Sequence, residues 1–194
     1  GNVGDAVPFS FDRLEQLQSD AVLEWNSVAL SAIQKDVTDP PVATRTLAMV
    51  SIAQLDTLNA ISGTPAFLVQ QSVTGTVNAQ AAAAAAAHRI LSTVYPAQKA
   101  TLDARLALSL DAVSDLAIRD ASRQLGVAVA DKVYQARRND GSTAFVNYSG
   151  SNAVGKWQKT GPMFDVPDQP HWQGVTPFAI AAANQLRQIG RAHV

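Results

Sequence analysis

The chain has 194 residues, of which 47% are hydrophobic and 16% charged, and its net charge is -1. These values are typical of a globular protein with an apolar core and exclude a disordered chain. The near-neutral charge argues against a nucleic-acid partner, which needs a basic face, and the lack of cysteine excludes disulfides and thiolate metal sites.

Polar residues interrupt every apolar run well before the roughly 20 residues that a membrane span needs. The chain begins at Gly1, with no basic segment followed by an apolar one. We therefore expect no membrane span, and a signal peptide that is either absent or already removed. The lack of cysteine leaves the compartment open, and we favour a secreted or periplasmic location over others. The oligomeric state stays open.

The first two predicted helices are separated by Pro40 and Pro41. Apolar residues at helical spacing, among them Trp25, predict an amphipathic helix over residues 20–35. The second helix, residues 41–61, is apolar on nearly all sides, which is typical of a helix at the centre of a larger bundle.

Two charged residues of the second helix, Arg45 and Asp56, lie about three helical turns apart and cannot touch within one helix. Because a buried unpaired charge is costly, we expect each to pair with another charge across the bundle rather than to take part in catalysis.

Seven consecutive alanines, Ala81–Ala87, follow Asn78, which is a good N-cap, and Tyr95-Pro96 ends the segment. Alanine has the highest helix propensity, so we predict a helix of about 17 residues, roughly 25 Å long. A surface of methyl groups lets neighbouring helices come close, which favours a packed helix over a low-complexity spacer.

The fourth helix is predicted to start at Pro96 and to point Leu102, Leu106, Leu110 and Val113 inward. The fifth covers residues 115–138, and its small residues Gly126 and Ala130 predict another close approach between helices. We interpret the basic pair Arg137-Arg138 at its end as solvated and favourable for the helix dipole.

Residues 142–176 show no periodicity, and a loop of this length is more often functional or wrapped around the domain than idle. We expect it to dock on the helical bundle through Trp157 and Trp172, whose large rings gain most from burial.

The three histidines, His88, His171 and His193, form no pair at the spacing of a catalytic zinc site. His88 and His171 are better explained as structural residues than as ligands. No Gly-rich phosphate loop, nucleophile elbow or dinucleotide fingerprint is present.

Five segments of the chain are PPVATRTLAMVSIAQLDTLNAI, NAQAAAAAAAHRILSTVYPAQ, GVAVADKVYQARRNDGS, GKWQKTG and HWQGVTPFAI. Taken together, they resemble the N-terminal helical half of bacterial vanadium-dependent haloperoxidases, which belong with the type 2 phosphatidic acid phosphatase superfamily. The resemblance spans residues 25–180, and its specificity comes from the order and spacing of the segments. The resemblance implies an alanine-rich helix at the position of Ala81–Ala87.

The resemblance implies a parent enzyme that oxidises halides with hydrogen peroxide at a bound vanadate. The family's vanadate ligands lie in three motifs: a lysine followed by Arg-Pro, a Pro-Ser-Gly-His run, and a Ser-Arg with a downstream histidine. Lys156 is not followed by Arg-Pro, and Tyr148-Ser-Gly-Ser151 lacks both the proline and the histidine. No catalytic, cofactor-binding or metal-binding residue is therefore assigned to this chain.

The last six residues, 189–194, read Ile-Gly-Arg-Ala-His-Val, the translation of a common sequencing-adaptor read-through. We expect residues 1–188 to be the natural N-terminal region of a larger domain, and the missing C-terminal half to be its partner. His193 is then left out of any functional argument.

The predicted fold is all-α: an incomplete bundle of about five main helices followed by a long irregular wrapping segment. Two alternatives to the haloperoxidase function stay open. In the first, the parent is a soluble acid phosphatase of the same superfamily. In the second, the chain is a helical interaction module without catalysis.

Overall fold

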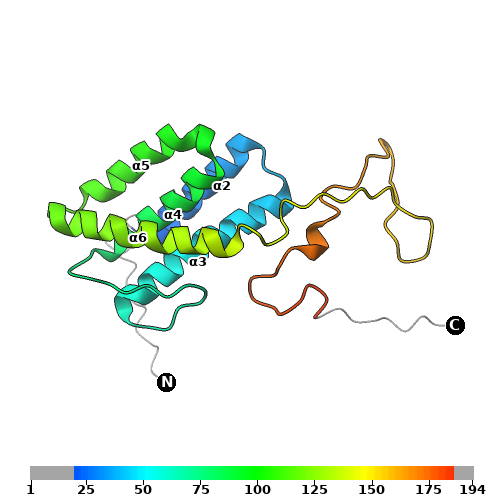
Figure 1. Ribbon diagram of the computed structural model, residues 1–194. Coiled ribbons are helices and arrows are strands. Elements are labelled where there is room, and N and C mark those ends of the chain that lie inside the picture. The colour runs from blue at the N-terminus through cyan, green and yellow to red at the C-terminus, as the bar shows by residue number, and fades with distance from the viewer. Residues whose placement is uncertain (1–19, 186–194) are drawn as a thin grey trace, which may run out of the picture. The chain divides into compact units, whose positions relative to one another are not determined.

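A computed structural model describes residues 20–185 of the chain. In this part the fold is all-α, with five helices and no strands, as the sequence predicts. The helices are α2 (Ala21–Asp36), α3 (Pro40–Ser62), α4 (Ala79–Val94), α5 (Lys99–Asp111) and α6 (Leu116–Arg137), with short 3-10 turns η1 (Pro96–Gln98) and η2 (Trp172–Gly174) (Figure 1). The expected artefact at 189–194 and His193 lie outside the described residues.

The described residues divide into two compact units, residues 20–135 and residues 136–185. The first contains α2 to α5 and most of α6, and the second contains the end of α6, the irregular segment and η2. No helix among the described residues is long and apolar enough to cross a membrane.

Local signals set the helix ends. Asn78 caps α4, because its side-chain oxygen accepts a hydrogen bond from the amide of Ala81 at 2.9 Å. Gly63 ends α3 in the left-handed conformation (φ +71°) that glycine adopts without strain. Pro40 and Pro41 occupy the first turn of α3, where a missing N–H costs least.

The core of the first unit is built around α4, which contacts α2, α3 and α5. All seven alanines of the run are buried, with exposed fractions of at most 1%. The predicted packed helix is thus confirmed. In the described part the central helix is α4, whereas α3 keeps exposed side chains such as Leu55 (45%). The place of α3 at the centre of a larger bundle stays a prediction.

Gly126 brings α6 against α4. A Cβ atom at this position would lie 2.2 Å from the carbonyl oxygen of Ala82 and 2.8 Å from the amide nitrogen of Ala86. The two backbones are therefore too close for any residue other than glycine at position 126. This confirms the predicted close approach at Gly126. The ion pair between Arg89 and Asp131 (2.6 Å) also joins these helices.

Residues 142–176 are irregular apart from η2, as predicted. Trp157 is 41% exposed and Trp172 is half-buried. Their docking on the bundle stays a prediction.

Candidate functional site

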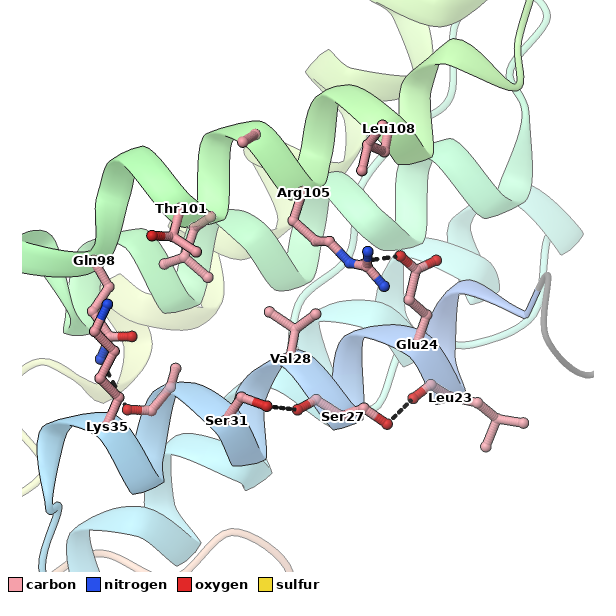
Figure 2. A pocket seen from close by; sticks show the side chains of 13 residues that line it. Leu23, Glu24, Ser27, Val28, Ser31, Lys35, Gln98, Thr101, Arg105 and Leu108 are labelled. Carbon is pink, nitrogen blue, oxygen red and sulfur yellow. Dashed lines mark hydrogen bonds and ion pairs between the residues drawn. The ribbon is translucent and has the colours of Figure 1, made fainter.

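A groove of about 750 Å³ runs between α2 and α5 in the first unit (Figure 2). Its walls are mainly apolar, and Leu23 and Leu108 are 47% and 63% exposed. Arg105 and Glu24 face each other across it, with Nε and Oε1 3.2 Å apart. The complete lining consists of Leu23, Glu24, Ser27, Val28, Ser31, Ala32, Lys35, Gln98, Thr101, Leu102, Ala104, Arg105 and Leu108.

Several polar side chains of the groove already have hydrogen-bond partners. The hydroxyls of Ser27 and Ser31 donate to backbone carbonyls one turn earlier in α2. The amide of Gln98 donates to the carbonyl of Ala32 at 2.9 Å. Neither serine hydroxyl donates to a carboxylate or a histidine that could act as its general base.

The sequence does not predict this groove, because the groove forms between two helices that are distant in the sequence. The sequence does contain one signal. Leu23 and Leu108 are apolar residues that helical spacing places opposite the buried faces of α2 and α5.

His88 lies in the core between α2, α4 and α5 and is 9% exposed. Its Nε2 is 2.8 Å from Oδ1 of Asp103, whose other oxygen lies 2.6 Å from Nζ of Lys99. The ring packs edge to face against Trp25, with centroids 6.0 Å apart. These contacts give His88 the hydrogen-bond partner and the packing that a structural histidine needs.

Burial lowers the pKa of His88 below 6.5, because desolvation of the imidazolium outweighs the opposing effect of Asp103. The hydrogen bonds from Lys99 and His88 lower the pKa of Asp103 in turn. His88 is therefore mainly neutral at neutral pH and holds α4 to α5 as a neutral hydrogen-bonding side chain.

Asp56 is fully buried, and the expectation that it pairs with a cation across the bundle is wrong. Its carboxylate instead accepts backbone hydrogen bonds from Phe67 (2.6 Å), Leu68 (2.9 Å) and Val69 (2.8 Å). Three amide dipoles thus stabilise the charge that a counter-ion was expected to balance. Arg45 is half-buried, and its expected ion pair stays a prediction.

Arg137 is 5% exposed, so its interpretation as part of a solvated helix end is wrong; Arg138 is exposed. In the second unit, Nη2 of Arg137 lies 2.9 Å from Oδ2 of Asp140, itself buried. The same guanidinium donates to the carbonyls of Thr176 and Pro177 and covers the ring of Phe178. Sequence reasoning missed these partners because they lie about forty positions away in a segment without periodicity.

His171 also has a structural contact, since its Nε2 donates to the carbonyl of Ser142 at 3.1 Å. Its ring packs against Trp172. The two described histidines therefore lie in separate units, each with a partner.

Vanadate needs a histidine and several cationic groups converging on one anion. His88 faces Asp103, and His171 donates to a backbone carbonyl. Across residues 20–185, no three His, Asp or Glu side chains are placed to hold a metal ion. No protein-family profile, curated protein or solved structure matches this chain.

Proposed function

We propose that the chain is the N-terminal, non-catalytic helical half of a vanadium haloperoxidase-like enzyme, which in its complete form oxidises halides with hydrogen peroxide. The observation that carries the proposal is the order and spacing of the five segments between residues 25 and 180. In this proposal the missing C-terminal half carries out halide oxidation. The present chain supplies the packed helices that support it.

The segments that carry the resemblance coincide with residues that hold the fold together. The first contains Asp56, which fixes a loop through three amides. The second is the buried alanine helix, and the third contains both Gly126 and the buried pair Arg137 and Asp140. Such residues are constrained by packing and hydrogen bonding, which supports a shared architecture rather than a chance similarity of composition.

The exposed apolar side chains on α2 and α5 also support a role as part of a larger protein. Leu23 and Leu108 flank the groove, and Leu30 on α2 is 56% exposed. Apolar patches of this kind mark surfaces that contact other protein.

The test is to recover the contiguous coding DNA beyond Gln188 and to express the complete protein. We expect the three vanadate-binding motifs in frame, and bromide-dependent consumption of peroxide after addition of vanadate. Hydrolysis of a phosphate ester without halide oxidation would replace the haloperoxidase by an acid phosphatase. An open reading frame without the three motifs would refute both enzymes and leave the helical interaction module.

A further inference from the structure

In the second unit, residues 137–142 and 171–178 form a neck that closes the long loop between them. The amide of Thr176 donates to the carbonyl of Asp140 at 2.8 Å. His171 donates to the carbonyl of Ser142 at 3.1 Å. Gly141 has a φ of +94°, and a Cβ atom there would lie 3.0 Å from the carbonyl oxygen of Gly174.

Arg137 adds a second set of contacts across the neck. Its guanidinium donates to the two consecutive carbonyls of Thr176 and Pro177, and its charge is balanced by Asp140. The Phe178 ring centroid lies 3.9 Å from its Cζ, within the range of a cation–π contact. The side chain of Asp140 also accepts from the amide of Ser142 at 3.1 Å, so one ion pair holds both sides of the neck.

The loop beyond the neck, residues 143–170, has no buried residue. Phe145, Met163 and Val166 are each more than 70% exposed. The rings of Tyr148 and Trp157 contact each other within the loop, with centroids 6.2 Å apart. A segment without buried residues has little stability of its own, so we expect its conformation to depend on the contacts at its base.

We propose that residues 143–170 form a strap that opens and closes as one unit on this neck, with Arg137 as its latch. Opening breaks the bonds to Thr176 and Pro177 and leaves Asp140 without its main counter-ion, while the helices of the first unit stay folded. When Arg137 is released, the contact between its guanidinium and the ring of Phe178 is lost as well.

Amide hydrogen exchange on the full chain, followed by mass spectrometry, tests the strap. Arg137→Ala should speed exchange in the peptides covering Ser142 and Thr176 by about tenfold or more, since charge-assisted bonds are lost. Peptides from α4 should exchange as in the wild type. Asp140→Asn should accelerate the same peptides, because it removes the other member of the pair.

The neighbouring Arg138 supplies the matched control. Arg138 is exposed, so Arg138→Ala should leave the neck peptides unchanged. Arg137→Lys should fall between the wild type and Arg137→Ala, because an ammonium can pair with Asp140 but lacks the planar fork that reaches two carbonyls. Wild-type exchange at the neck in Arg137→Ala would overturn the proposal. Faster exchange in α4 as well would also overturn it, because Arg137 would then support the whole fold.

Discussion

At the scale of single residues, His88 makes the stability of the bundle depend on pH. Burial lowers its pKa below the 6.5 of the unfolded chain, so the unfolded state takes up a proton more readily than the folded state. The stabilisation is complete above the unfolded pKa and is lost as the pH falls through 6.5 toward the folded pKa. Asp103 stays ionised in this window, because its own pKa lies below 3.8.

We therefore predict that the wild type loses more stability than His88→Gln between about pH 7.5 and pH 5.5. The measurement is the urea midpoint, followed by helical circular dichroism at both pH values. His171→Gln, in the other unit, is the control and should keep the wild-type pH dependence. An equal loss in the wild type and in His88→Gln would show that His88 does not cause it.

Asp56 is the second residue whose substitution has a clear expected effect. Asp56→Asn keeps the size of the side chain but removes the charge and turns one acceptor into a donor facing backbone N–H groups. We expect a loss of about 2–4 kcal/mol in the free energy of unfolding, because bonds to a charged group are broken and buried amides lose their acceptor. Asp120 is exposed on α6, so Asp120→Asn should change the unfolding free energy by less than about 0.5 kcal/mol. Equal stability of the two variants would contradict the assigned role of Asp56.

At the scale of helices, the contact between α4 and α6 can be tested by whether Gly126→Ala raises or lowers the free energy of unfolding. In an exposed helix, Gly126→Ala would stabilise by about 1 kcal/mol through helix propensity. Here the added Cβ meets backbone atoms of Ala82 and Ala86 that cannot rotate away, so we expect a loss of about 1–3 kcal/mol. Thermal or urea unfolding measures it, with exposed Arg123→Ala on α6 as the neutral control. A Gly126→Ala protein more stable than the wild type would show that the helices are further apart than described.

The helices could be predicted from the sequence because their determinants are local. Asn78, Pro40 and Gly63 act within a turn of where they stand, and helical spacing of apolar residues gives the buried faces. The roles of Asp56 and Arg137 could not be predicted, since both bind backbone groups of irregular segments, which leave no side-chain pattern in the sequence. The groove between α2 and α5 depends on how two helices pack, and this geometry is not encoded in either helix alone.

At the scale of the whole molecule, the proposed function predicts what the isolated chain cannot do. Vanadate is held by several cationic and hydrogen-bonding groups around a histidine, and the described histidines are each engaged, by Asp103 and by the carbonyl of Ser142. Arg137 is likewise committed to Asp140 and two backbone carbonyls.

We expect the purified 194-residue chain to show no heat of vanadate binding at micromolar concentrations and no bromide oxidation with peroxide. Circular dichroism on the same sample should show the helical spectrum of α2 to α6, so that a negative result is obtained on folded protein. Inorganic phosphate, which has the same tetrahedral shape, serves as the second ligand and should not bind either. Saturable vanadate binding or bromide turnover would mean that the active site lies within this chain, and the division of labour between two halves would be wrong.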